Sequence, residues 1–137
     1  MRAVVLADPT VACLIKPMVR KIDIATATVT TLAGLAGESG SADGSASAAR
    51  ARFYYPAGVA SDKAGNLFVA DASNHTIRMI VAASQVVSTV VGAASRQGVL
   101  LGSLPGELDA PAGLAFGDSG QLFITEQHQN AVLVAKF

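Results

Sequence analysis

Cysteine is almost absent from this sequence, which excludes a fold held together by disulfide bonds. The 137 residues include one cysteine, Cys13, within the apolar run 11–15. A single thiol cannot form a disulfide within the chain. No His or Lys directly flanks Cys13, and the apolar surroundings favour a buried structural thiol over a reactive one.

Charge is scarce as well, and it is balanced. Charged residues make up 15% of the chain, and ten basic side chains offset ten acidic ones. Without a basic cluster, nucleic-acid binding has no electrostatic support, so we expect no nucleic-acid partner. No apolar run approaches the roughly 18 residues that cross a bilayer, and we expect no membrane span in this chain. The 51% of apolar residues suffices for a buried core and argues against disorder.

What the sequence does contain is an internal repeat. Residues 53–71 align without a gap with residues 108–126, at an offset of 55, and the alignment matches a Pro-x-Gly motif, a later glycine and an apolar triplet. Such a fixed register is hard to obtain by chance. A weaker copy comes first, in which residues 4–8 resemble 67–71 and residues 29–34 resemble 87–92. Its two landmarks lie five residues further apart than in the central copy, which indicates an irregular unit with an insertion near Pro17.

The central unit predicts four short strands, at residues 58–61, 67–70, 76–81 and 85–91. These segments are rich in β-branched residues, and Asp, Asn and Gly fill the turns between them. No long stretch has the 3.6-residue period of a helix, so we expect little helix. Four antiparallel strands that recur every 55 or so residues predict the blades of a propeller. The predicted fold is all-β, a partial β-propeller of four-stranded antiparallel blades.

The chain divides into three predicted units. Residues 1–34 are a partial blade with strands b–d, residues 35–92 are a connector plus a complete blade, and residues 93–137 are a connector plus a partial blade with strands a–c. The first connector is rich in Gly, Ala and Ser, and the second is more apolar. We expect each connector to join the outer strand of one blade to the inner strand of the next.

The central unit resembles an NHL repeat. The segments that carry the resemblance are 57–62, 65–71 and 74–80, the last of which begins with the Asn74-His75 pair of the family signature. The resemblance covers residues 29–92, continues at 105–137, where Gln129-Asn130 replaces Asn-His, and is weakest over 3–24. It implies a six-bladed propeller, most often used as a binding platform.

This chain holds too few blades to close a ring by itself. A closed propeller has typically four to eight blades, whereas the predicted strands amount to about two and a half. Two explanations stay open: a longer chain supplies the missing blades, which we place first, or several copies assemble. Ten predicted strands do not divide into whole four-stranded blades, which makes assembly harder. The outermost units would expose apolar faces and unpaired edges.

Two histidines occupy matching turns. His75 could ligate a metal or act as a general base, but Asn and His tolerate the unusual dihedrals of turns, which favours a structural role. His128 lies in the corresponding turn of the next unit and has no partner at metal-ligand spacing, so we expect no zinc site.

Acidic side chains and serines are the remaining candidates. A cation site near the propeller axis would draw on Asp62, Asp71, Asp118 and Glu126. Asp71 more simply bonds the amides of its own turn, and no local loop offers the six to eight oxygens that calcium takes. The serines of the first connector lie in no nucleophile elbow or phosphate loop; they are Ser39, Ser41, Ser45 and Ser47. We therefore assign no catalytic, metal or cofactor residue and expect no cofactor, and the binding residues stay open.

The preferred function is a binding scaffold without catalysis, with a protein as the expected partner and with loops on one face of the disc as the contacts. The alternative is a fragment of a propeller enzyme that resembles the metal-dependent lyases or lactonases, and a purely structural module is a third hypothesis. The predicted inner strands, 58–61 and 113–116, carry small and apolar residues rather than inward His, Asp or Glu. That pattern favours binding, although the fold itself does not decide.

Overall fold

A computed structural model describes residues 3–5, 10–15, 17–44, 47–81 and 83–137 of the chain, with the backbone alone for the first two segments. Cys13 lies in one of those two segments. The expected burial of its thiol therefore lies outside the described residues.

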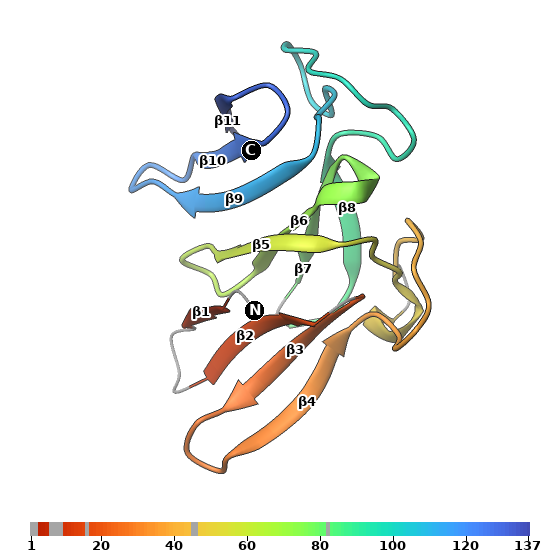
Figure 1. Cartoon of the computed structure of the whole chain (residues 1–137). Coiled ribbons are helices and arrows are strands. Elements are labelled where there is room, and N and C mark those ends of the chain that lie inside the picture. Colours follow the sequence, from red (N-terminus) through yellow and green to blue (C-terminus); the bar gives the residue numbers. More distant parts are fainter. Residues whose placement is uncertain (1–2, 6–9, 16, 45–46, 82) are drawn as a thin grey trace.

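The described chain forms three antiparallel sheets in chain order (Figure 1). The first sheet consists of β1 (Ala3–Val5), β2 (Thr10–Ile15), β3 (Met18–Asp23) and β4 (Thr28–Ala33). The second sheet consists of β5 (Pro56–Ser61), β6 (Leu67–Asp71), β7 (Thr76–Ile80) and β8 (Val87–Val91). The third sheet consists of β9 (Pro111–Phe116), β10 (Leu122–Glu126) and β11 (Ala131–Ala135). The helices of the described part are two single 3-10 turns, η1 (Ala48–Arg50) and η2 (Ala72–Asn74), so the all-β prediction is confirmed.

The first sheet has four strands, where the sequence predicted three. Residues 4–8 were expected to match the second strand of a blade, but Ala3–Val5 form the innermost strand and Thr10–Ile15 form the second. The reason lies in the apolar and β-branched character of Thr10–Ile15, which suits a strand. This segment pairs along its whole length with β3. The assignment of strands b–d was therefore wrong, and the division into three units stays a prediction.

The repeat extends to the backbone. A β-bulge interrupts the β3–β4 and β7–β8 ladders at equivalent places. Tyr55 and Ala110, which are 55 residues apart, have φ angles of 58° and 54°, and His75 and Asn130 have φ angles of 58° and 49°. Residues other than glycine rarely adopt this left-handed conformation. Its recurrence at the same offset shows that the units share their turns as well as their strands.

The sheets pack face to face, and each buries apolar side chains against the next (Figure 1). We call the side of a sheet that is turned toward the following sheet its front face, and the opposite side its back face. The front face of the first sheet and the back face of the second contribute Val19, Ala33, Leu67, Val69, Ile80 and Val87 to one core. The front face of the second sheet and the back face of the third contribute Phe68, Ala70, Ile77, Val91, Leu122 and Ile124 to another. Removal of this apolar surface from water is the main stabilising contribution.

Close contact between inner strands requires a glycine. Strands β5 and β9 lie side by side (Figure 1), and a Cβ atom at position 58 would overlap the backbone carbonyl oxygen of Ala112 in β9. Gly58 therefore allows the two sheets to approach at the centre. This glycine belongs to the Pro-x-Gly motif of the repeat.

We expect Gly58→Ala to destabilise the chain by about 1–3 kcal/mol, because the added methyl group forces two backbones apart. Gly40→Ala is the matched control, since its Cβ would lie 3.1 Å from the side-chain Cβ of Arg52, whereas the Cβ at position 58 would overlap a backbone oxygen. Urea unfolding followed by circular dichroism measures both changes. Equal losses of stability would show that the β5–β9 contact is not tight.

Candidate functional site

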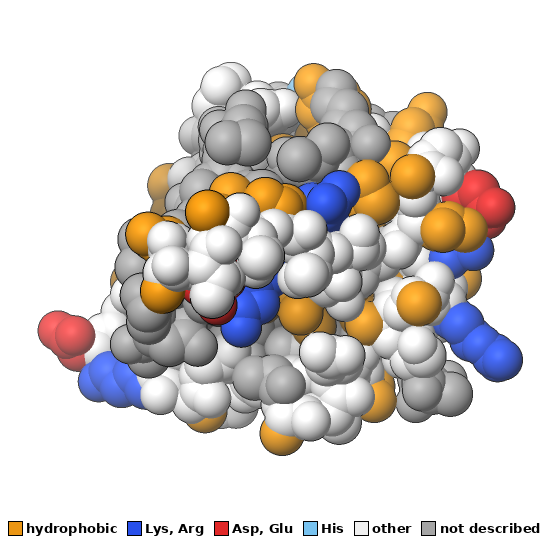
Figure 2. Space-filling model, turned by 90° about the horizontal axis from the view of Figure 1, so that it is seen from below, with side chains coloured by type: hydrophobic (Ala, Val, Ile, Leu, Met, Phe, Trp, Pro, Cys, Tyr) orange, Lys and Arg blue, Asp and Glu red, His pale blue; other side chains and the backbone are white. Residues whose placement is uncertain are grey.

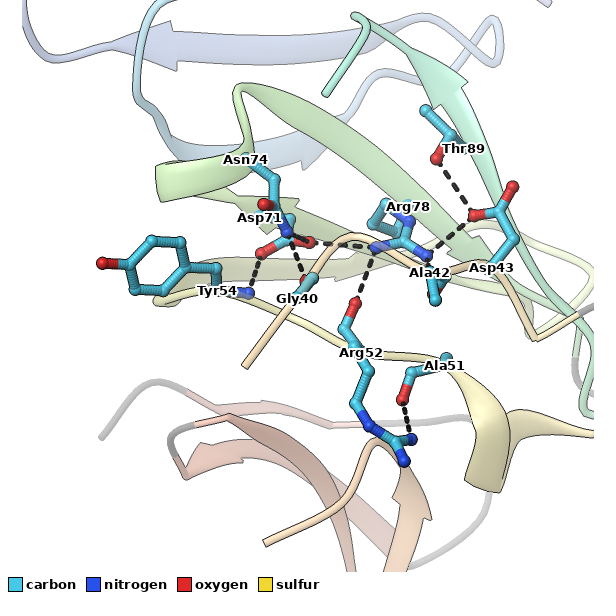
Figure 3. Close-up of polar contacts among 10 residues, drawn as sticks. All are labelled: Gly40, Ala42, Asp43, Ala51, Arg52, Tyr54, Asp71, Asn74, Arg78 and Thr89. Carbon is cyan, nitrogen blue, oxygen red and sulfur yellow. Dashed lines mark hydrogen bonds and ion pairs between the residues drawn. The ribbon is translucent and has the colours of Figure 1, made fainter. Parts of the chain in front are cut away.

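Arg78, in β7, is completely buried and fastens the first connector to the central blade (Figure 3). Its Nη1 donates to Asp71 Oδ2 at 3.0 Å and to the carbonyl oxygen of Arg52 at 2.9 Å. Its Nη2 donates to the carbonyl oxygen of Ala42 at 2.8 Å and to Asp43 Oδ1 at 2.7 Å. Charge-assisted bonds of this kind are stronger than neutral ones. They hold the first connector in place as far as Tyr54 and Tyr55, at its end.

Asp71 bonds the connector as well as a side chain of its own turn. Its Oδ1 accepts the backbone N–H of Tyr54 at 2.7 Å, and its Oδ2 accepts Asn74 Nδ2 at 2.7 Å as well as the guanidinium. In the described structure the turn contributes the side-chain amide of Asn74 and no backbone amide, so the predicted bond within the turn is present only through a side chain. Burial raises the pKa of Asp71 to about 6, against the lowering effect of the Asn74, Tyr54 and Arg78 contacts. The group is ionised at neutral pH and pairs with Arg78.

The third sheet repeats half of this arrangement. Glu126 Oε2 accepts the backbone N–H of Asp109 at 2.8 Å, as the equivalent carboxylate of Asp71 accepts an amide of the first connector. Leu133 stands where the second sheet has Arg78, and Glu126 Oε1 has no hydrogen-bond partner among the described residues. Burial, with a further contribution from Asp109, raises the pKa of Glu126 to about 7.

Asp109 brings polar side chains from the second connector and the third sheet together. Gln129 Nε2 donates to its Oδ2 at 3.0 Å, Gln97 Nε2 donates to its Oδ1 at 3.0 Å, and His128 Nδ1 lies 3.0 Å from Oδ1. The bond from Gln129, followed by those from His128 and Gln97, lowers the pKa of Asp109. Because an ionised carboxylate only accepts hydrogen bonds, His128 Nδ1 carries the proton in this contact.

His75 reaches the same place from the second sheet. It ends η2 in the left-handed conformation, as expected for this turn. Its Nδ1 accepts the backbone N–H of Ala110 at 3.2 Å, which requires that Nδ1 is unprotonated. The separation of 3.8 Å between His75 Nδ1 and Asp109 Oδ1 is therefore not an ion pair while the ring is neutral. The two histidines, 53 residues apart in the chain, meet around one carboxylate.

A polar hollow of about 450 Å³ lies between these turns. Its side chains come from both connectors and from the turns after β6 and β10; they include Tyr55, Ser73, His75, Gln97, Gln127 and His128. Tyr54 and Tyr55, at the end of the first connector, are 53% and 50% exposed, and the side chain of His128 is 59% exposed. We call the group formed by Tyr54, Tyr55, His75 and His128 the tyrosine–histidine surface.

The four acidic candidates do not form one site. Asp62 and Asp118 lie in the turns that precede β6 and β10, and Asp71 and Glu126 lie at the far ends of those strands. Asp62 accepts the backbone N–H groups of Ala64 and Asn66 in its own turn. In the described part of the chain, no three His, Cys, Asp or Glu side chains are grouped so that they could hold a metal ion. Nor is any helix there long and apolar enough to cross a membrane.

The serine candidates have no catalytic arrangement in the described part. Ser47 Oγ accepts the backbone N–H of Ala49 and so caps η1; Ser45 lies outside the described residues. Asp109 and Gln97 were not found by sequence reasoning, because nothing in the local sequence marks them. The repeat did contain a usable signal, since equivalent turns of consecutive blades lie next to each other.

We expect Arg78→Leu to cost about 3–5 kcal/mol of stability, because it leaves the Asp71 carboxylate buried without its cation. Asp71→Asn in the same chain should restore part of the loss. Arg96→Leu is the matched control: its ion pair with Glu107 is solvent-exposed and should contribute less than about 1 kcal/mol. Urea unfolding measures all three variants, and similar losses for Arg78→Leu and Arg96→Leu would contradict the argument.

The stability of the chain should depend on the ionisation of Glu126. The folded state holds a proton on Glu126 up to about pH 7, whereas the unfolded state loses it near the usual pKa of 4.5. The contribution of Glu126 to stability is therefore greatest below that value and falls as the pH rises from it to about 7. Asp71 contributes in the same direction, but only up to about pH 6. Melting temperatures between pH 6 and 8 should fall in the wild type and stay level in Glu126→Gln. An equal fall in that variant would show that another group causes the change in melting temperature.

Comparison with known proteins agrees with this architecture. The family model for the NHL repeat matches residues 53–78. None of the curated protein sequences that were compared matches the chain.

Solved structures share the fold at low sequence identity. A structural genomics protein of unknown function from Bacteroides thetaiotaomicron has a TM-score of 0.82 and 22% identity, and the match covers 90% of this chain and 31% of that one. An auxiliary nutrient binding protein from Bacteroides ovatus has a TM-score of 0.76 and 16% identity, with 93% and 35% covered. An auxiliary nutrient binding protein from Bacteroides thetaiotaomicron has a TM-score of 0.76 and 18% identity, with 93% and 35% covered. The chain thus spans about a third of the length of these structures. Residues 53–78 match the NHL repeat, and the chain has the fold of a partial β-propeller, with two four-stranded antiparallel sheets and a three-stranded one in its described part.

Proposed function

We propose that this chain is a binding module without catalysis, and that it binds a protein through the tyrosine–histidine surface. The observation that carries the proposal is that a half-exposed tyrosine, Tyr55, lines a polar hollow on a rigid scaffold, next in the chain to the half-exposed Tyr54. Loops held by such a scaffold commonly carry function. Two structurally similar proteins are described as nutrient binding proteins, which supports binding as a use of this fold.

Tyrosine is suited to protein contacts. It offers a large and rigid side chain at low cost in conformational entropy, and it is enriched where binding energy is concentrated. Tyr54 is fixed at both backbone groups: its N–H donates to Asp71, and its carbonyl oxygen accepts the N–H of Ser73. The ring of Tyr54 points away from this network (Figure 3). A partner would therefore meet a backbone that is already ordered, which lowers the entropic cost of binding.

One observation favours the alternative of a propeller-enzyme fragment. Asp109 orients His128 through Nδ1, which leaves Nε2 as the free ring nitrogen, and a carboxylate that orients a histidine is a common arrangement in acid–base catalysis. The described residues do not add further metal-ligating side chains to this pair. The alternative therefore rests on His128 alone, and the binding module is the better-supported function.

A displayed library of random peptides, selected on the purified chain, tests the proposal. We expect the selected peptides to lose at least tenfold in affinity on Tyr55→Ala and on His128→Ala. Leu35→Ala is the control, because Leu35 is also exposed but lies in the loop after the first sheet. Binding that all three variants retain would refute this surface. A rise in melting temperature with calcium or zinc that His128→Ala abolishes would favour the enzyme fragment.

A further inference from the structure

The front face of the third sheet is apolar and uncovered. Phe123 is 39% exposed, whereas the equivalent Phe68 of the second sheet is 4% exposed. Val132 is 62% exposed, whereas the equivalent Ile77 is completely buried, and Val134 beside it is 51% exposed. Phe123 pairs with Val134 across the β10–β11 ladder, so these side chains form one continuous patch. The third sheet thus exposes the residues that the second sheet buries.

Gly113, in the third sheet, suggests which structural element would pack against this face. Gly113 is the equivalent of Gly58, where the backbone of the next inner strand leaves no room for a Cβ atom. At Gly113 the nearest atoms to such a Cβ belong to Thr125, in the same sheet, whose Oγ1 would lie 2.9 Å away. This oxygen belongs to an exposed side chain that can rotate, unlike the backbone atoms that exclude a Cβ at Gly58. The requirement for glycine would arise at this position if a further inner strand lay against β9 as β9 lies against β5. The face is therefore built to receive another blade.

The described part of the back face of the first sheet, on β3 and β4, is exposed in the complementary sense. Val29 is 48% exposed, whereas the equivalent Val87 is completely buried against the preceding sheet. Ile22 pairs with Val29 as the buried Ile80 pairs with Val87, and Ile22 is half-buried. Figure 2, seen from below relative to Figure 1, shows hydrophobic side chains among polar ones on this side of the molecule. The front face of the third sheet and the described back face of the first sheet thus both lack a sheet packed against them.

We propose that a second copy of this chain covers the front face of the third sheet with the back face of its own first sheet. The contact repeats the relation that already joins the first sheet to the second and the second to the third. This head-to-tail assembly is independent of the ligand proposed for the tyrosine–histidine surface. Head-to-tail contacts form a closed ring when their rotations add up to a full turn.

The number of sheets fits closure by two copies. The described residues of each chain form three sheets, and closed propellers have typically four to eight blades. Six is the multiple of three in that range, so two copies complete the ring. The absence of a fourth strand from the third sheet does not prevent the contact. A three-stranded sheet already covers the front face of the second sheet and buries Phe68 and Ile77.

Light scattering coupled to size-exclusion chromatography of the full 137-residue chain tests this assembly. We expect the wild type to have the mass of two chains. Val132→Glu alters the open front face and Val29→Lys the open back face, and each variant alone should have the mass of one chain. Leu35→Glu, an exposed apolar position in a loop, is the matched control and should remain a pair. Because all three positions are exposed, circular dichroism should show unchanged sheet content.

A mixture of the two charged variants separates head-to-tail assembly from other contacts. A mixed pair places both altered faces in one interface, where opposite charges meet, and leaves the second interface unaltered, so the mass of two chains should return. A wild-type mass of one chain would overturn the proposal and leave the face to a further blade of a longer chain. Pairing that survives Val29→Lys would indicate front-to-front contact, and a mass above two chains would exclude the closed pair; either result also overturns it.

Discussion

A buried guanidinium holds the central blade to the connector that precedes it. Arg78 satisfies four oxygen atoms, three of which belong to the connector and one to Asp71. Burial of two charges is costly, and the pair is stabilising only because these additional hydrogen bonds accompany it. The pair also fixes geometry. The connector could take many paths across the blade, but the observed path gives Asp71 the N–H of Tyr54 and gives Arg78 three of its four oxygen acceptors.

The third blade reaches the same backbone arrangement with a different interior. Leu133 replaces the arginine and packs against the core between the second and third sheets, while Glu126 keeps only its bond to the amide of Asp109. The second connector is fastened instead by amide side chains on Asp109 and by an exposed ion pair between Arg96 and Glu107. An apolar replacement of a buried ion pair is often neutral for stability. In the third sheet only the arginine is replaced, so the carboxylate of Glu126 remains without a cation and its charge opposes folding.

Much of the fold could be predicted from the sequence, because the offset of 55 aligns turns as well as strands. The four strands of the central sheet lie within two residues of their predicted limits. The first sheet could not be predicted in the same way, because the likeness of residues 4–8 to 67–71 pointed to the wrong strand. The insertion expected near Pro17 is not found, since residues 16–17 separate β2 from β3, whereas 72–75 separate β6 from β7. The tyrosine–histidine surface could not be predicted from the sequence, for another reason. Asp109 acts through contacts with Gln97, Gln129 and His128, and contacts between separate elements leave no local pattern in the sequence.

The convergence of His75 and His128 on one carboxylate has an evolutionary consequence. The site belongs to neither repeat unit, since it exists only where two units adjoin. Duplication of a single unit would therefore create a new seam of its own, with turn residues free to diverge while the apolar interior remains under constraint. Chemical novelty in such an array can arise from the order in which units are joined, and transposition of two units would change the surface without any change to their cores.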